Sequence, residues 1–207
     1  MQRRQFLKSS AGVVGAPTII QSTALGQGDR PAPSERINIG VIGLGGMGNG
    51  NMNGLMRQKD TQILAVCDVD KQKGSGPAKE RVEKYYSERD AKDYKGCTAY
   101  GDFRELCARE DIDAVVVATP DHWHALATLE ALRNGKDVYC EKPVTHLFGE
   151  GQAVYREVAK QKAIFQTGSQ QRSNVRFRIA VEVVLNGLLG MLKHVEVGLP
   201  GGGGTDK

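Results

Sequence analysis

The sequence lacks several features that would assign it at once to a simple class. No apolar run reaches the roughly 18 residues that are needed to span a bilayer. Glycine accounts for 26 of the 207 residues but follows no strict period, and there are only 7 prolines, which excludes collagen-like and low-complexity chains. With 40% apolar and 25% charged residues the chain can build a hydrophobic core, so wholesale disorder is excluded as well.

The sequence also lacks a basic stripe. The formal net charge is +4, but residues 1–26 contain three of the 28 basic residues and none of the 24 acidic residues. The rest of the chain therefore has a net charge of +1, with both signs interspersed. A nucleic-acid-binding protein needs a basic patch, so we expect no nucleic-acid partner.

Residues 1–26 have the pattern of an export signal. Arg3 and Arg4 are followed by Phe-Leu-Lys, then by a mildly apolar stretch and by small residues that suit a signal peptidase. The pattern resembles a bacterial twin-arginine signal, and the alternative is an uncleaved basic N-terminus. We therefore expect an exported, periplasmic or extracellular protein with no membrane span after signal removal, and a short linker over residues 27–35.

After the linker, short apolar runs alternate with longer amphipathic segments. The predicted strands are residues 37–44, 63–67, 98–100, 114–118, 137–140 and 164–167, and the predicted helices are residues 46–58, 77–89, 103–109, 125–133 and 150–162. This alternation predicts an α/β fold, a doubly wound parallel Rossmann sheet with right-handed crossovers, over residues 36–168.

Residues 43–48 match the G-x-G-x-x-G pattern of a dinucleotide-binding turn. The match is supported by its context, because it follows an apolar strand, opens a helix and precedes Asp68 by 20 residues. Gly43 permits a tight turn, Gly45 lets the backbone approach a pyrophosphate, and Gly48 allows close packing of helix on strand. The helix N-terminus offers N–H groups to the phosphates. The predicted cofactor-binding residues of the turn are Gly43, Gly45, Gly46, Met47 and Gly48.

Asp68 favours one of the two nicotinamide dinucleotides. At the end of the second predicted strand it would accept hydrogen bonds from the adenosine ribose hydroxyls. Its charge would repel a 2′-phosphate, and Val69-Asp70 supplies no arginine to offset that repulsion. We therefore predict NAD as the cofactor, with NADP disfavoured. The alternative is a structural glycine turn beside a surface aspartate.

Two further polar segments follow predicted strands, where an open α/β sheet binds its ligand. Residues 119–125 (TPDHWHA) follow the fourth strand, and Glu141-Lys142-Pro143 follows the fifth. A lysine at this edge can exchange a proton with an alcohol or carbonyl oxygen, so Lys142 is the candidate catalytic residue. The alternative is that Glu141 and Lys142 form an ordinary solvated pair.

The sequence favours neither a metal site nor disulfides. His122 and His124 stand beside Asp121, but their spacing points them to different sides of a helix and no third ligand is evident, so Asp121 reads more simply as a helix cap. Cys67 and Cys140 end the second and fifth strands, which would lie about 14 Å apart in a 3-2-1-4-5 sheet and beyond disulfide reach. We expect no metal, and free thiols at all four cysteines.

Together these motifs resemble the Gfo/Idh/MocA oxidoreductases. The glycine turn, Asp68, residues 119–125, the Glu-Lys-Pro segment and Gly-Ser-Gln-Gln-Arg at residues 168–172 carry the resemblance, which covers about residues 36–197. It implies a nicotinamide-binding domain, with Lys142 at the nicotinamide and the substrate and a cis bond before Pro143. It also implies cofactor contacts from Thr119, Pro120, His124, Glu141 and Lys142, and, more weakly, substrate contacts from His146, Gln171 and Arg172. Arg172 as a surface charge stays an alternative.

The resemblance further implies a second, α+β domain, of which residues 169–207 contain only the start. We expect a connecting helix over residues 175–189 and a first strand over residues 194–197, and therefore a truncated chain. In this family the missing sheet commonly forms the oligomer interface, so a homo-oligomer is an open alternative.

The expected function is NAD-dependent hydride transfer between nicotinamide and a hydroxyl or carbonyl of a small-molecule sugar or polyol. Two alternatives stay open. One is an NAD-dependent glycosidase lineage, in which transient oxidation of a sugar permits elimination of the aglycone. The other is a truncated nucleotide-binding module without turnover.

Overall fold

The computed structural model describes residues 31–89 and 93–198, so the predicted signal over residues 1–26 lies outside the described residues. The chain divides into two compact units, Met1–Thr167 and Gly168–Lys207, which are described one at a time. Among the described residues, no helix combines the length and the apolar character that a membrane crossing requires.

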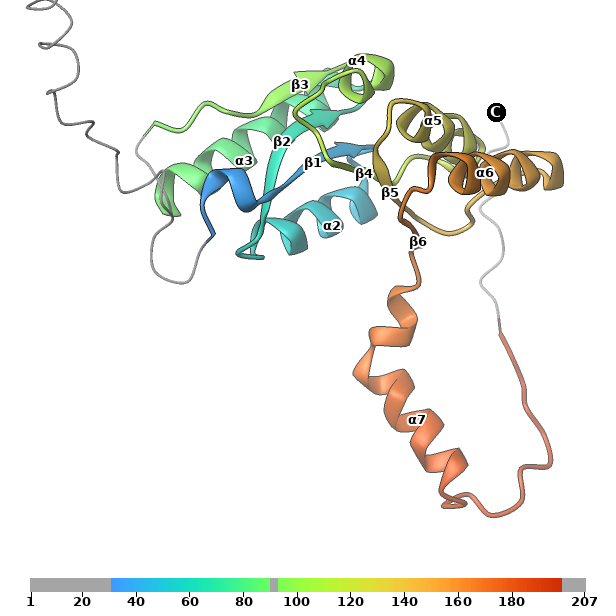
Figure 1. Cartoon of the computed structure of the whole chain (residues 1–207). Coiled ribbons are helices and arrows are strands. Elements are labelled where there is room, and N and C mark those ends of the chain that lie inside the picture. Colours follow the sequence, from blue (N-terminus) through green and yellow to red (C-terminus); the bar gives the residue numbers. More distant parts are fainter. Residues whose placement is uncertain (1–30, 90–92, 199–207) are drawn as a thin grey trace, which may run out of the picture. The chain divides into compact units, whose positions relative to one another are not determined.

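The described part of the first unit is built around a six-stranded sheet in the order β3-β2-β1-β4-β5-β6, with every neighbouring pair parallel (Figure 1). The strands are β1 (Ile37–Ile42), β2 (Thr61–Cys67), β3 (Thr98–Tyr100), β4 (Ala114–Val117), β5 (Asp137–Cys140) and β6 (Phe165–Thr167). The order reverses between β1 and β4, which is the switch point of a doubly wound sheet. The predicted Rossmann fold is therefore confirmed.

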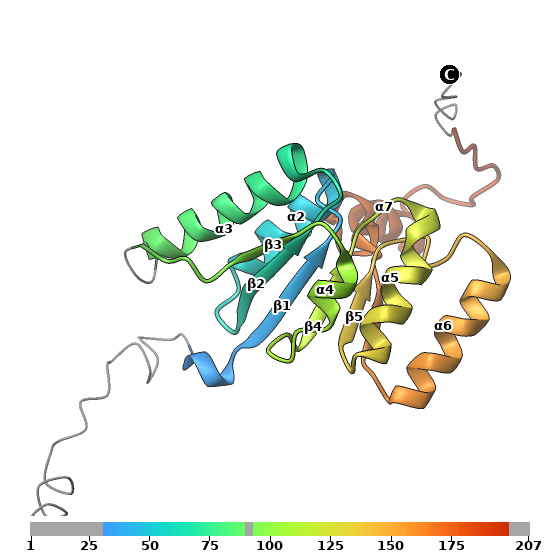
Figure 2. The ribbon, with the colours of Figure 1, turned by 90° about the horizontal axis from the view of Figure 1, so that it is seen from above.

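Helices cover both faces of the sheet (Figure 2). They are α2 (Gly46–Met56), α3 (Gly76–Arg89), α4 (Phe103–Cys107), α5 (Asp121–Arg133) and α6 (Phe148–Gln161), with short turns η2 (Pro33–Glu35) and η3 (Lys71–Ser75). Met52 of α2 and Val82 of α3 pack in one buried cluster, and Leu106 of α4 and Leu132 of α5 pack in the other. Because both faces are covered, the central strands are apolar throughout rather than alternating.

Two helices begin earlier than the sequence predicted. Helix α5 begins at Asp121 instead of residue 125, with Pro120 at its N-cap. Asp121 is therefore the first helical residue and not the cap, a place where its charge still suits the helix dipole. Helix α6 begins at Phe148 because Glu150 satisfies the start of the helix: its Oε2 accepts hydrogen bonds from the backbone N–H groups of His146 and Leu147, both at 2.9 Å.

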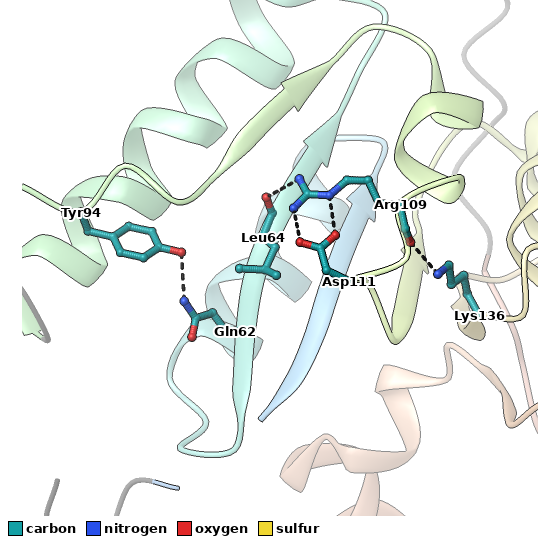
Figure 3. Close-up of polar contacts among 6 residues, drawn as sticks. All are labelled: Gln62, Leu64, Tyr94, Arg109, Asp111 and Lys136. Atoms are coloured by element: carbon teal, nitrogen blue, oxygen red, sulfur yellow. Dashed lines mark hydrogen bonds and ion pairs between the residues drawn. The ribbon is translucent and has the colours of Figure 1, made fainter. Parts of the chain in front are cut away.

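A group of polar contacts connects segments of the first unit at some distance from the glycine turn (Figure 3). Arg109 donates to both carboxylate oxygens of Asp111, at 2.8 and 2.6 Å, and to the Leu64 carbonyl at 3.3 Å. These hydrogen bonds lower the pKa of Asp111. The largely buried Lys136 donates to the Arg109 carbonyl at 2.6 Å, so the segments that lead into β4 and β5 are tied together.

The second unit consists, in its described part, of the turn η4 (Gln170–Ser173) and helix α7 (Val175–Leu185). The Asn174 side chain caps α7 by accepting from the Arg176 N–H at 2.9 Å. The helix ends four residues before the predicted end, because Gly187 adopts a positive φ of 71° that terminates helices. The predicted strand over residues 194–197 is wrong for this structure, since no strand is assigned there. A strand requires a hydrogen-bonded neighbour, and the described part of this unit offers none.

All four cysteines are free, as predicted, and all four are buried. Burial is the main cause that raises the pKa of Cys67, Cys97 and Cys107 to about 12 and that of Cys140 to about 11. The thiols therefore stay protonated near neutral pH and are poor nucleophiles.

The raised thiol pKa values predict a loss of stability in alkali. An unfolded thiol ionises near pH 9.0 while the folded thiols hold their protons to about 11 or 12, so the unfolded chain binds fewer protons above pH 9. The free energy of unfolding should therefore fall as the pH rises, with a slope for each thiol of about 0.7 kcal/mol per pH unit at pH 9 that approaches about 1.4 kcal/mol per pH unit above pH 10. Urea unfolding at pH 8 to 10 measures this slope. In the variant Cys107→Ala the slope should be smaller by one thiol's share, and an unchanged slope would contradict the argument.

Candidate functional site

The glycine turn joins β1 to α2 at the carboxyl end of the sheet. Gly43 has φ +86°, and a Cβ there would lie 2.6 Å from the Ala118 and Thr119 backbone. A Cβ on Gly48 would lie 1.8 Å from the Gly43 carbonyl oxygen. The tight turn and the close helix–strand contact predicted from the sequence are thus confirmed. Only glycine fits at either position.

The outer side of the turn is open. A Cβ on Gly45 or on Gly46 would meet no atom within 4 Å, and Met47 is 42% exposed. Gly45 is the N-cap of α2 and has no side chain to occupy the helix N-terminus. The first N–H groups of α2 therefore face space that an anionic ligand can enter, which is the geometry that a diphosphate requires.

Asp68 fastens the turn to the end of β2. Its Oδ2 accepts from the Leu44 N–H at 2.8 Å, and its Oδ1 accepts from the Asp70 N–H at 2.9 Å. A Cβ on Gly74 would lie 2.5 Å from the Asp68 Cγ, so the loop after β2 packs directly on this carboxylate. Each carboxylate oxygen keeps a further lone pair, so Asp68 can still accept hydrogen bonds from a ligand. The role in holding the turn was not predicted.

A cavity of about 310 Å³ lies beside Asp68, at the carboxyl ends of β1 and β2. Its lining is mainly apolar and includes Phe103 and Trp123, whose rings meet edge to face at 6.3 Å. Gly43, Thr119 and Pro120 complete the wall next to the turn. A mainly apolar slot whose lining also includes Asp68, Asp102 and Arg104 suits a flat heterocycle joined to a hydroxylated ring.

Lys142 follows β5, two strands along from β1. Its side chain is exposed, and the Lys142–Pro143 peptide bond is cis, as the resemblance implied. The neighbouring Glu141 is 4% exposed, and its backbone N–H donates to the Val117 carbonyl at 2.9 Å. The carboxyl end of the sheet thus presents the glycine turn over β1 and the lysine over β5.

Glu141 is connected to helix α2. The Asn51 side chain of α2 donates to Glu141 Oε1 at 2.9 Å, and the Tyr139 hydroxyl donates to the same oxygen at 3.4 Å. Burial and the Glu141 charge raise the pKa of Tyr139, which keeps the phenol protonated as a donor. Oε2 of Glu141 is buried and has no hydrogen-bond partner among the described residues. Glu141 is therefore not the solvated half of an ion pair.

His124 and Thr119 lie at the carboxyl ends of β4 and β5. The His124 ring, 1% exposed, contacts the carbonyl oxygens of Thr119 and Pro143. Thr119 follows β4, and its Oγ1 is buried without a hydrogen-bond partner among the described residues. His122, by contrast, is exposed on the same helix.

The remaining predicted site residues are His146, Gln171 and Arg172. His146 is exposed, with its backbone N–H bound to Glu150. Gln171 and Arg172 belong to η4 in the second unit, where they are exposed. Their substrate contacts stay predictions.

The arrangement fits a nicotinamide dinucleotide on several independent observations. The open N-terminus of α2 accommodates a diphosphate, the slot beside Asp68 accommodates an adenosine, and the buried Glu141 and Thr119 oxygens leave polar capacity unused toward β4 and β5. The residues of this site that the sequence did not predict are Asn51, Phe103, Arg104, Trp123 and Tyr139. Of these, Asn51 had a local signal, because it lies one helical turn after Gly48.

Comparisons with known proteins agree with this geometry. A family model, GFO_IDH_MocA, described as an oxidoreductase family with an NAD-binding Rossmann fold, matches residues 37–169. Inositol 2-dehydrogenase of Rubrobacter xylanophilus is 31% identical over 159 residues, which cover 76% of this chain and 42% of that protein. The glycosyl hydrolase family 109 protein 2 of Shewanella sp. (strain ANA-3) is 29% identical over 213 residues, covering 94% of this chain and 45% of that protein.

Among solved structures, a probable dehydrogenase from Thermotoga maritima superposes with a TM-score of 0.61 at 28% identity, over 74% of this chain and 42% of that one. The chain thus spans less than half the length of the relatives that it matches. The match includes the glycine turn, Asp68 and the Glu-Lys-Pro segment. The chain belongs to the Gfo/Idh/MocA family of oxidoreductases and contains its NAD-binding Rossmann domain.

Proposed function

We propose that this chain supplies the cofactor-binding half of an oxidoreductase that moves a hydride between NAD and a sugar or polyol. One observation carries the proposal: the carboxyl edge of a single sheet presents an open helix N-terminus, a ribose-type carboxylate and a lysine. The named relatives support the substrate class, because one of them is an inositol 2-dehydrogenase.

Each residue has a distinct part in this proposal. The first N–H groups of α2 bind the diphosphate, and Asp68 accepts from the adenosine ribose. When bound, NAD supplies the hydride acceptor at its nicotinamide ring. Lys142 exchanges a proton with the substrate oxygen, as a general acid or base according to the direction of the reaction.

The environment of Asp68 supports NAD over NADP. Two backbone N–H groups hold its carboxylate in place, so it cannot easily turn away from a 2′-phosphate. Arg104 lines the neighbouring cavity, but its guanidinium is paired with Asp102 at 3.1 Å. Because this arginine is already paired with a carboxylate, it offsets less of the repulsion between Asp68 and the 2′-phosphate of NADP.

Calorimetry and a substitution at Lys142 test the proposal together. The full chain should bind NAD more tightly than NADP, and NADH formation should be measured over a panel of polyols. Lys142→Met should leave NAD affinity within about threefold and lower any turnover by about 10² to 10⁴. Lys84→Met, at an exposed lysine on α3, is the matched control. A chain that binds no NAD would overturn the proposal, and binding without turnover on any substrate would favour the nucleotide-binding module.

A glycosidase is the second candidate function. The glycosyl hydrolase family 109 match extends over 94% of the chain, against 76% for the inositol dehydrogenase. In such an enzyme the sugar would be oxidised transiently, the aglycone eliminated and the cofactor restored. Release of the aglycone from a glycoside substrate without NADH accumulation separates this activity from net polyol oxidation.

We further propose export by a twin-arginine-type signal over residues 1–26, which places the protein in the periplasm or outside the cell. The Arg3-Arg4 pair followed by Phe-Leu-Lys supports it. Expression of the full gene in a bacterial host, with and without Arg3→Lys and Arg4→Lys together, tests it. Equal amounts of exported protein from both versions would argue against the signal.

A further inference from the structure

The His124 side chain occupies an unusual position between two strand-end loops. It projects from α5, is 1% exposed, and its Nε2 lies 2.7 Å from the carbonyl oxygen of Thr119, in the loop after β4. Its Nδ1 contacts the carbonyl oxygen of Pro143, in the loop after β5. One ring therefore spans the two loops that border the nicotinamide side of the sheet.

The chemistry of these two contacts suits a ring that joins the loops. A backbone carbonyl oxygen only accepts hydrogen bonds, so an N–H on either ring nitrogen donates to the carbonyl that it faces. The rest of the buried ring fills the space between the loop after β4 and the loop after β5.

The same geometry separates His124 from direct ligand contact. Both of its nitrogens are already occupied by protein carbonyls, and its ring is buried. The charged residues on the segments that it joins are Asp121 on α5 and Glu141 and Lys142 beside Pro143. Of these, Glu141 is fixed from the opposite side by Asn51 of α2. The Lys142 segment is thus held by one helix on each side.

We propose that His124 is a positioning residue that lies between the Thr119 and Pro143 carbonyls and so fixes the Lys142 segment beside the nicotinamide end of the cofactor. The inference rests on the proposed function, because it assumes that the dinucleotide extends from Asp68 toward β5. It assigns to His124 a role through Lys142 and not a contact with the cofactor.

The positioning role is tested by comparing two ligands that differ only at the nicotinamide end. Calorimetry on His124→Gln should show NADH affinity lower by about tenfold, the equivalent of one hydrogen bond, with ADP-ribose affinity within about twofold of the original. His122→Gln, at an exposed histidine two residues away, should change neither affinity. Equal losses for both ligands, or no loss for NADH, would overturn the role.

The two proposals can fail separately. An unaltered chain that binds neither NADH nor ADP-ribose would overturn the proposed function and the positioning role with it. An unaltered chain that binds both ligands, together with a His124→Gln variant that binds NADH as tightly as the unaltered chain, would overturn the positioning role alone and leave the proposed function in place.

Discussion

Replacing Gly48 with alanine should abolish measurable NAD binding and weaken the first unit. The new Cβ would lie 1.8 Å from the Gly43 carbonyl oxygen, and a backbone atom cannot move aside as a flexible side chain can. Helix α2 would have to shift away from β1, and its N-terminus would leave the phosphate-binding position. We expect a loss of roughly 100-fold or more in NAD affinity by calorimetry and about 1–3 kcal/mol in the free energy of unfolding.

Gly50→Ala is the matched control for this prediction. Gly50 lies two residues later in the same helix, and a Cβ there would meet no atom within 4 Å. Alanine is the better helix former, so this variant should gain up to about 1 kcal/mol of stability and keep its NAD affinity. Similar NAD affinities in the Gly48 and Gly50 variants would show that the diphosphate does not bind at this turn.

Replacing Asp68 should have the second-largest effect on NAD affinity, through two separate losses. Asp68→Ala removes the acceptor for the ribose and also frees the Leu44 N–H, which Asp68 now holds at 2.8 Å. We expect NAD affinity to fall about 30-fold or more, the sum of two modest hydrogen-bond terms. NADP affinity should fall less, because the charge that repels the 2′-phosphate is also lost. The measured selectivity for NAD over NADP should therefore decrease.

Asp113→Asn is the control that separates a loss of stability from a loss of NAD affinity. Asp113 Oδ2 accepts from the Asn38 N–H at 2.7 Å, a contact of the same kind as that of Asp68, at the other end of β1. This variant should lose some stability and no NAD affinity. Asp68→Asn, which keeps one acceptor oxygen without the charge, should fall between the original protein and Asp68→Ala. An unchanged selectivity in both Asp68 variants would argue against the ribose contact.

The main elements of the fold could be predicted because their signals are local. Apolar runs such as residues 114–118 indicate strands that are buried on both faces. The glycines at positions 43 and 48 indicate a turn whose geometry only glycine allows. The predictions are wrong where a local pattern is ambiguous. The sequence predicts that α5 begins at residue 125, because residues 121–124 carry little apolar periodicity. Pro120 and Asp121 nevertheless favour the earlier start that the structure has.

The candidate site was predicted less completely, since its key contacts join residues far apart in the sequence. Asn51 reaches Glu141 across 90 positions, and His124 reaches Pro143 across 19. These pairs meet only because crossover connections bring β1, β4 and β5 together. The strand predicted over residues 194–197 is wrong because a local β-type pattern does not say whether a neighbouring strand exists. In the described part of its unit there is no strand for it to pair with.

The burial of every cysteine has a practical consequence for following ligand arrival. The first unit buries all four cysteines, so a maleimide dye should react only slowly with the native chain. The variant Trp123→Cys would place one reactive thiol at the cavity beside Asp68, because position 123 is 43% exposed there. A fluorophore fixed there would sit next to the proposed adenosine slot and could report its filling in real time.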